Sequence, residues 1–303
     1  MLNSAIVNQV IILFLLMVAG FFAMKRDIID KNTVKKLSEV LVRITLPAMI
    51  ITSFNREFSR ELLANGGIML VYSLSIHIFS ILLGNIIFRK YEKSARDVLK
   101  FVTVYSNCGY MGLPILEALY GQTGVFYGSI YIAVFNVFTW THGIMIFTGE
   151  KDSKSFKKAL TNPGIIAVFV GLLIFFFSIK LPYPVIKTFE LLGAMTTPLS
   201  MLIIGSLIAD AEFKKLFSGF TMYYVTAIRL ILLPLITLIA FKALGINDTV
   251  LLGSSIATAA MPAAANTAVL AERYNGDSHL ASRIVAFSTI LSMITIPLIL
   301  SLI

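Results

Sequence analysis

The sequence alternates long hydrophobic runs with short polar connections. Windows of about twenty residues separate ten hydrophobic runs, which cover residues 4–24, 35–54, 65–88, 98–120, 124–148, 163–180, 186–208, 219–241, 248–271 and 281–302. Each run has the roughly 18 to 25 residues that an α-helix needs to cross the hydrocarbon core of a bilayer. The pattern therefore predicts an all-α, multi-pass integral protein of the cell membrane with ten transmembrane helices.

The composition strengthens this prediction, because 57% of the residues are hydrophobic and only 14% are charged. No Lys or Arg precedes the first run and no small-residue cleavage site follows it. We therefore expect this run to stay in the mature protein as a helix rather than to be removed as a signal peptide. The single cysteine, Cys108, excludes a disulfide bond within the chain.

The net charge of +9 is distributed unevenly. Alternate connections hold sixteen Lys and Arg residues, in 25–36, 89–96, 149–162, 210–218 and at Arg273. The opposite side holds five, namely Arg56, Arg60, Lys180, Lys187 and Lys242. Since basic loops remain on the cytoplasmic side, the bias predicts that both termini lie outside. It also assigns the positive charge to the surface of a lipid bilayer, so we expect no nucleic acid as a partner.

The two halves of the chain repeat one another. Pro47 in the second run corresponds to Pro198 in the seventh, and Pro114 in the fourth run corresponds to Pro262 in the ninth. With five helices per half, the second copy enters the membrane from the opposite side, so the repeat is inverted. The predicted units are a first repeat over residues 1–149, a cytoplasmic linker over 150–162 and a second repeat over 163–303. Such a repeat with interrupted helices is typical of secondary transporters.

Two runs contain residues that interrupt a helix, in "SNCGYMGLP" and "MPAAANT". We expect the first break from about Cys108 to Leu113, with Pro114 opening a second half-helix, and the second break around Pro262. Two half-helix N-termini with unpaired N–H groups, brought together at mid-membrane, would favour an anion. The alternatives are that the prolines are kinks without function and that the asparagines only tie helices together.

Four segments, "SNCGYMGLP", "NPGIIAVFVGLL", "RLILLPL" and "MPAAANTAVLAERYNGD", resemble motifs of the auxin efflux carrier family, which includes bacterial proteins described as malonate or malate transporters. The resemblance covers nearly the whole chain. It implies crossed, broken helices 4 and 9, in an architecture similar to that of bile-acid symporters and sodium/proton antiporters. It also implies a dimer through a scaffold of helices 1, 2, 6 and 7, with helices 3–5 and 8–10 as a mobile unit. The short central linker, in contrast with the long loop of the plant carriers, does not support auxin as the substrate.

The resemblance also suggests the substrate-binding residues. They are Asn107, Gly109, Gly112 and Pro114 on one side, Pro262, Asn266 and Thr267 on the other, and Asn136 in the fifth helix. Ionisable residues inside a membrane are functional candidates by default. His77 and Glu117 are candidates for carrying a coupled proton, although His77 can also be a neutral, satisfied histidine and Glu117, which would repel an anion, can be structural.

The hypothesis from the sequence is a secondary transporter of small organic anions, of the carboxylate class, that moves its site by an elevator-type mechanism. A cation or proton-coupled antiporter of the same architecture is the alternative, but few acidic residues lie in the middle of the runs. An intramembrane enzyme is the third possibility. The sequence lacks the His-Glu-x-x-His and Gly-x-Ser-x-Gly motifs and a pair of intramembrane aspartates, so we expect no catalytic residue, metal or cofactor.

Overall fold

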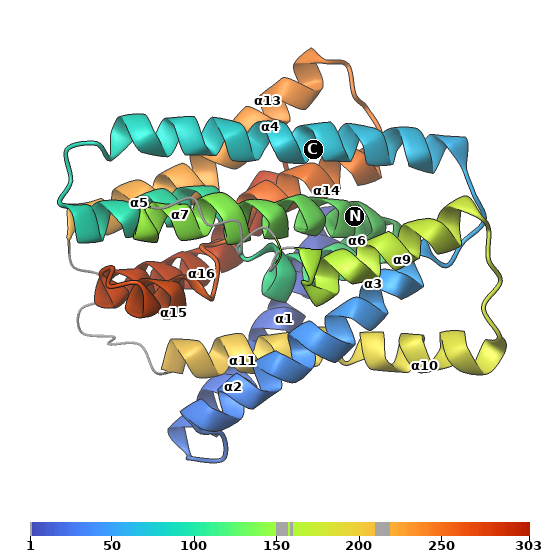
Figure 1. Ribbon diagram of the computed structural model, residues 1–303, viewed down its shortest axis with the longest axis horizontal. Helices are drawn as coiled ribbons and strands as arrows, with labels where there is room; N and C mark the ends of the chain where they lie inside the picture. Colours follow the sequence, from blue (N-terminus) through green and yellow to red (C-terminus); the bar gives the residue numbers. More distant parts are fainter. Residues whose placement is uncertain (1, 150–156, 158–159, 210–218) are drawn as a thin grey trace.

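The computed structural model describes residues 2–149, 157, 160–209 and 219–303, and these residues form helices and short connections (Figure 1). The helices of the first half are α1 (Leu2–Lys25), α2 (Lys31–Val40), α3 (Leu46–Phe54), α4 (Arg60–Ile87), α5 (Lys93–Val104), α6 (Leu113–Phe138) and α7 (Ile144–Thr148). The second half contains α9 (Pro163–Phe176), α10 (Tyr183–Ala194), α11 (Thr196–Ala209), α12 (Phe220–Ala227), α13 (Leu233–Ala243), α14 (Thr249–Ala260), α15 (Thr267–Arg273) and α16 (Ser278–Leu300). Most of the predicted linker 150–162 lies outside the described residues.

Seven helical stretches among the described residues are long and apolar enough to cross a membrane. They are Val7–Lys25, Lys31–Phe54, Arg60–Ile87, Cys108–Thr148, Tyr183–Ala209, Phe220–Ala243 and Ser278–Leu300. Two shorter apolar helices, Pro163–Phe176 and Thr249–Ala260, accompany them. These helices confirm the prediction of an all-helical, multi-pass membrane protein.

The stretch Cys108–Thr148 is not one straight helix. Gly121 has a positive φ of 58° and a ψ of −149°, a conformation that glycine adopts at little cost. Beyond it the chain runs back along itself. A Cβ on Gly128 would clash with the side chains of Leu113 and Leu116, and the Tyr105 hydroxyl donates to the Phe138 carbonyl over 2.9 Å. The residues on either side of Gly121 therefore form an antiparallel pair.

Three of the helices contain a π-helical turn directly before a Leu-Pro pair. The turns are Leu41–Thr45, Cys108–Gly112 and Ile228–Leu232, and the prolines are Pro47, Pro114 and Pro234. Proline has no N–H to donate to the carbonyl four residues earlier, and its ring clashes with that carbonyl. A wider turn removes the clash without ending the helix.

The first of two groups of helices consists of α1, α2, α3, α9, α10 and α11. Helices α1 and α11 approach closely because Gly20 and Gly205 face the backbone of the opposite helix, where a Cβ would clash. The Ser206 hydroxyl adds a hydrogen bond of 3.1 Å to the Gly20 carbonyl. Close contact through small residues is the usual way in which helices associate in lipid.

The second group contains α4 to α7 and α12 to α16. In Figure 1, α4, α13 and α14 lie in the upper part, whereas α2, α10 and α11 of the first group lie in the lower part. Side chains within the second group join its two halves. The Tyr72 hydroxyl donates to the Ser255 carbonyl over 2.9 Å, and the Asn65 amide donates to the Asp248 carboxylate over 3.3 Å.

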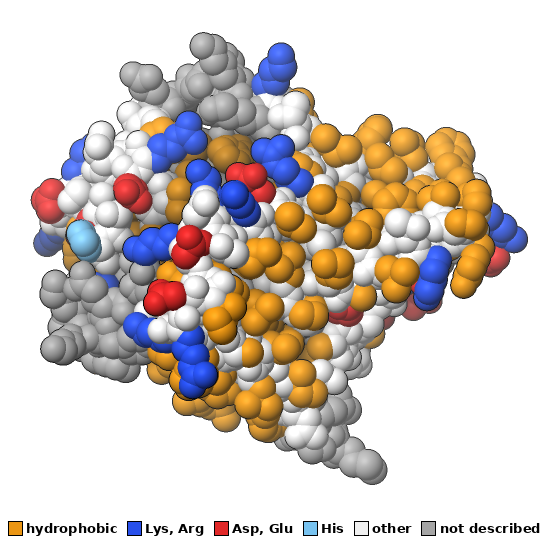
Figure 2. All heavy atoms as spheres, turned by 90° about the horizontal axis from the view of Figure 1, so that it is seen from below, with side chains coloured by type: hydrophobic (Ala, Val, Ile, Leu, Met, Phe, Trp, Pro, Cys, Tyr) orange, Lys and Arg blue, Asp and Glu red, His pale blue; other side chains and the backbone are white. Residues whose placement is uncertain are grey.

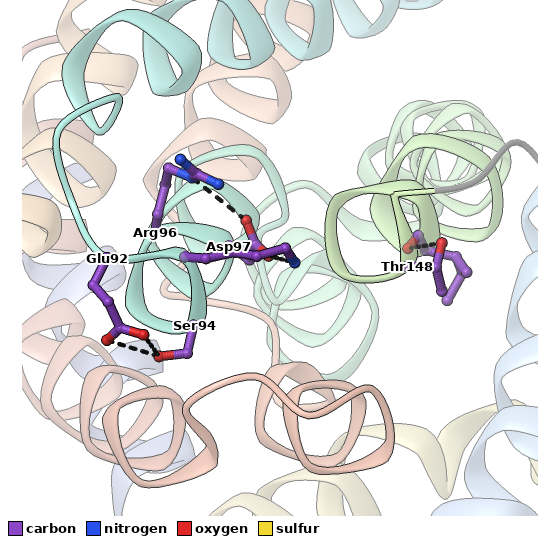
Figure 3. A network of polar contacts seen from close by, with 7 residues as sticks. Glu92, Ser94, Arg96, Asp97 and Thr148 are labelled. Atoms are coloured by element: carbon purple, nitrogen blue, oxygen red, sulfur yellow. Dashed lines mark hydrogen bonds and ion pairs between the residues drawn. The ribbon is translucent and has the colours of Figure 1, made fainter.

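The surface has a charged end and a broad apolar belt. Figure 2 shows Lys, Arg, Asp and Glu side chains gathered at the left end of the molecule, with hydrophobic side chains covering most of the face beyond them. At the start of α5, the buried carboxylate of Asp97 accepts from Lys93 over 2.8 Å and lies 3.7 Å from Nε of Arg96 (Figure 3). The Ser94 hydroxyl donates to Glu92 over 3.1 Å in the same cluster.

Candidate functional site

The site begins where two helices stop inside the protein. Helix α5 ends at Val104 and α14 ends at Ala260, and each continues as extended backbone. The two extended segments pair with each other as a short antiparallel bridge between Ser106 and Ala263. The Asn107 N–H donates to the Pro262 carbonyl over 2.8 Å, and the Ala264 N–H donates to the Tyr105 carbonyl over 3.0 Å. We call this meeting of the two breaks the crossover.

The first break differs from the sequence expectation of Cys108 to Leu113. The residues that leave the helix are Tyr105–Asn107, and Cys108–Gly112 forms the π-helical turn that leads into α6. The physical reason is that Pro114 needs only a wider turn before it, whereas extended backbone in lipid needs partners for its N–H and C=O groups. Those partners come from the second break, which the local sequence does not reveal.

The crossover also uses some of the N–H groups that we expected to be open. The amides of Asn107 and Ala264 are paired, and the Ala263 N–H donates to the Ser288 hydroxyl over 3.2 Å. The amides of Gly109 and Tyr110 lie in the first turn of the following helix, where a helix provides no internal acceptor. The backbone N–H groups of Gly109 and Tyr110 therefore remain hydrogen-bond donors of the kind that we expected at a broken helix.

A cavity of about 210 Å³ lies against the crossover. Its lining consists of Val42, Leu46 and Ile50 beside α3; Ser106, Asn107, Gly109 and Tyr110 at the first break; Ile132, Phe135, Asn136, Thr139 and Trp140 at the end of α6; Asn162 and Gly164 at the start of α9; and Ala264, Ala265 and Asn266 at the second break. Both groups of helices contribute to this lining. None of these residues is Lys, Arg, Asp or Glu.

The polar lining is formed mainly by four asparagines, Asn107, Asn136, Asn162 and Asn266. Asn107 is 3% exposed, and its Nδ2 has no hydrogen-bond partner among the described residues. The buried hydroxyl of Thr139 is also without a partner in the described part of the chain. Unpaired donors are costly in a buried site. Both residues also line the cavity.

Of the eight residues suggested for substrate binding, Asn107, Gly109, Asn136 and Asn266 line the cavity. The other four lie behind the lining. A Cβ on Gly112 would lie 3.4 Å from the Met261 side chain, and the Thr267 hydroxyl donates to the Ala264 carbonyl. Pro114 is buried at the start of α6, and the Pro262 carbonyl accepts from Asn107. Asn162, Thr139 and Trp140 line the cavity without having been suggested. Asn162 was missed because the sequence does not show that α9 begins beside the cavity.

Comparison with known proteins identifies the family. A profile described as "Membrane transport protein" matches residues 5–156 and 150–300. The chain belongs to this family of membrane transport proteins, the auxin efflux carriers. An uncharacterized transporter of Methanocaldococcus jannaschii is 27% identical over 96% of both chains. A Rhizobium meliloti protein described as "Putative malonate transporter" is 23% identical over 86% of this chain and 84% of its own. An uncharacterized transporter of Escherichia coli, YfdV, is 23% identical over 96% of both.

In this membrane transport protein, His77 lies in α4 close to the cavity wall. Its ring centroid is 5.2 Å from that of Phe138, 5.1 Å from that of Tyr131 and 6.3 Å from that of Phe135, which lines the cavity. Its Nδ1 pairs with the Ser73 carbonyl over 2.7 Å, and its Nε2 has no partner among the described residues. His77 is thus only half satisfied.

Glu117 lies away from the cavity, between the two groups of helices. Its carboxylate accepts a hydrogen bond of 3.1 Å from the hydroxyl of Thr197, the second residue of α11. Glu117 belongs to the first turns of α6, so this bond connects the second group to the first. Glu117 therefore contacts the other group of helices and does not line the cavity.

Arg229 holds the other side of the crossover. The sequence shows it only as one of several ionisable residues within hydrophobic runs, and its position in the π-helical turn before Pro234 became evident from the structure. The side chain is 3% exposed, and its guanidinium group donates to three backbone carbonyls. These carbonyls are Thr103 at 3.0 Å, Ala259 at 2.8 Å and Met261 at 3.0 Å.

Proposed function

We propose that this protein is a secondary transporter of small organic anions, of the carboxylate class, and that the cavity at the crossover binds the substrate. The observation that carries the proposal is the unpartnered, buried amide of Asn107 beside three further asparagines in a cavity of about 210 Å³. Amide N–H groups are good donors to carboxylate oxygens. The volume suits a molecule of a few heavy atoms.

The chemistry of the lining favours an anion over a cation. Hard cations in proteins are held by carboxylates and carbonyls, and no carboxylate lines this cavity. The first-turn amides of Gly109 and Tyr110 add the positive end of a half-helix. The name of the Rhizobium meliloti relative refers to malonate, which agrees with a small dicarboxylate as the first substrate to test.

We further propose ten membrane crossings in two inverted five-helix repeats. The seven long stretches become ten when Cys108–Thr148 is divided at Gly121 and the shorter helices α9 and α14 are counted. In this arrangement, α5 and the first part of α6 form the broken fourth helix, and α14 and α15 form the broken ninth helix. The pairing of Ser106 with Ala263 supports this assignment, because equivalent breaks of two inverted repeats meet at their common centre.

The transport mechanism that we propose is an elevator-type movement of the second group of helices against the first. The cavity lies between the groups, and the tightly interlocked pair of α1 and α11 suits a fixed scaffold. His77 and Glu117 are the proposed coupling residues, because one is half satisfied beside the cavity and the other connects the two groups. The family resemblance supports a homodimer formed through the scaffold.

The binding proposal is tested by thermal unfolding of the purified protein with malonate, succinate, acetate and indole-3-acetate. A ligand at 100 times its Kd adds about 2.7 kcal/mol to the free energy of unfolding, so the substrate should raise Tm measurably. Asn107→Ala should weaken binding by about 1–3 kcal/mol, since it removes a donor to a charged ligand. Asn85→Ala, on the exposed face of α4, is the matched control and should bind as the wild type does. Equal ligand-induced shifts in both variants would refute the assignment of the cavity.

A further inference from the structure

Arg229 joins two helix ends that come from opposite halves of the chain. Thr103 lies next to the last residue of α5, and Ala259 and Met261 flank the last residue of α14. The carbonyls at the end of a helix have no internal partner and carry the negative end of the helix dipole. One guanidinium group satisfies carbonyls from both ends, at 2.8 to 3.0 Å.

The charge of Arg229 has no carboxylate beside it. The ion pairs found among the described residues involve Lys93, Arg96 and Lys187, and none involves Arg229. The positive charge of Arg229 is therefore balanced by backbone dipoles. A buried cation without such partners would be strongly destabilising, and buried carbonyls without a donor would also be costly. The stability of the buried arginine and that of the carbonyls therefore each require the other.

Carbonyls at half-helix ends are also the groups that coordinate sodium in transporters with interrupted helices. A monovalent metal ion and a guanidinium group carry the same charge, and both take carbonyl oxygens as partners. Among the described residues, no group of three or more His, Cys, Asp and Glu side chains is placed to hold a metal ion. The crossover thus holds one set of oxygens suited to a cation, and Arg229 already binds three of them.

We propose that Arg229 is a resident cation that takes the place of a metal ion at the crossover. It is a positioning residue: it neutralises the two helix ends and keeps the breaks paired, while the substrate lies on the other side of the bridge. The consequence, which rests on the proposed transport function, is that the crossover offers no site for a coupled sodium ion. The carbonyl set should bind an external cation only when the arginine side chain is removed.

The test uses thermal unfolding of the purified protein without substrate, so it does not depend on knowing what is transported. The Tm of the wild type should be the same in sodium and in choline chloride. Arg229→Ala should lower Tm by about 10 °C or more, because it leaves buried carbonyls unpaired. Millimolar guanidinium should then restore a substantial part of this loss in Arg229→Ala. Arg229→Lys, which keeps the charge but has fewer donors, should lie between the two proteins.

Lys242→Ala is the matched control, since Lys242 also donates to a backbone carbonyl from the helix that follows Arg229 but is exposed. Guanidinium should not raise its Tm. A wild-type Tm that rises with sodium but not with choline would overturn the proposal, and so would an Arg229→Ala protein with wild-type Tm. If Arg229→Ala fails to fold, the proposal is still tested by the sodium titration of the wild type and by the Tm of Arg229→Lys. Absence of a substrate-induced shift in the wild type would instead count against the transport function.

Discussion

Asn107 and Arg229 donate hydrogen bonds to neighbouring carbonyls of the second break. The amide of Asn107 donates to the Pro262 carbonyl, while Arg229 donates to the neighbouring Met261 carbonyl. Asn107 lines the cavity, and its buried Nδ2 has no hydrogen-bond partner among the described residues. At the scale of single residues, the crossover therefore has a neutral residue, Asn107, that lines the cavity and a charged residue, Arg229, that does not. Under the proposed function, this division would allow a cavity without basic residues to bind an anion.

Replacing Pro114 by alanine tests whether the turn before it matters to the site. An alanine restores an N–H that can donate to the carbonyl of Tyr110, so the π-helical turn should relax to an α-helical one. Gly109 and Tyr110 would then rotate relative to the cavity, and substrate uptake into proteoliposomes should fall at least about tenfold, equivalent to 1.4 kcal/mol. Pro297→Ala is the control, because Pro297 lies within α16 without a π-helical turn before it. Wild-type uptake by Pro114→Ala would show that this turn is only a kink.

At the scale of elements, the two groups of helices are joined by the hydrogen bond between Glu117 and Thr197. If the groups slide past each other during transport, this bond must break in each cycle. The contact between Asn65 and Asp248 lies within the second group and should persist. The Glu117–Thr197 contact connects the two groups, whereas the Asn65–Asp248 contact lies within one group. Locking each contact in turn therefore tests whether the groups move against each other.

Cysteine pairs at these positions test the movement. In a Cys108→Ala background, an oxidised pair at Glu117 and Thr197 should abolish uptake, and reduction should restore it, because a disulfide would lock the two groups together. The oxidised pair at Asn65 and Asp248 should transport at the rate of the reduced protein. Uptake that continues with the first pair fully oxidised would contradict an elevator movement.

The sequence predicted the helices better than the breaks, for a physical reason. Hydrophobic length determines where a chain can cross lipid, so the positions of most helices followed from the runs alone. Pro114 marked the region of the first break, but the non-helical residues Tyr105–Asn107 depend on partners more than a hundred residues away. The roles of Arg229 and Asn162 depend in the same way on which helix ends lie beside them. Such contacts become visible only in the folded chain.

At the scale of the whole molecule, basic side chains gather mainly at the left end of the view in Figure 2, with others at the right end. The sixteen-to-five distribution along the chain predicts which end faces the cytoplasm. Lys90 lies in the connection between α4 and α5, and Lys180 lies in the connection between α9 and α10. Both residues are exposed, whereas the native Cys108 is buried. Cysteines introduced at these two positions can therefore report the orientation of the protein in the membrane, with little labelling of the native Cys108.

If both termini lie outside, as the charge distribution predicts, Lys90→Cys should resist a membrane-impermeant maleimide in intact cells and react after the membrane is opened. Lys180→Cys should react in intact cells. The physical basis is that basic loops stay on the cytoplasmic side during insertion. The opposite labelling pattern would reverse the predicted orientation without affecting the fold.

The pairing of Ser106 with Ala263 also constrains how the protein is made. The first break enters the membrane while its partner has not yet been synthesised, and the intervening chain takes on the order of ten seconds to translate. During that time the Tyr105 carbonyl and the Asn107 amide lack the partners that Pro262 and Ala264 later provide. Unpaired backbone groups in hydrocarbon cost several kcal/mol each, so the nascent first half must keep this segment in contact with water or with the insertion machinery. The second half of the chain therefore completes the insertion of the first.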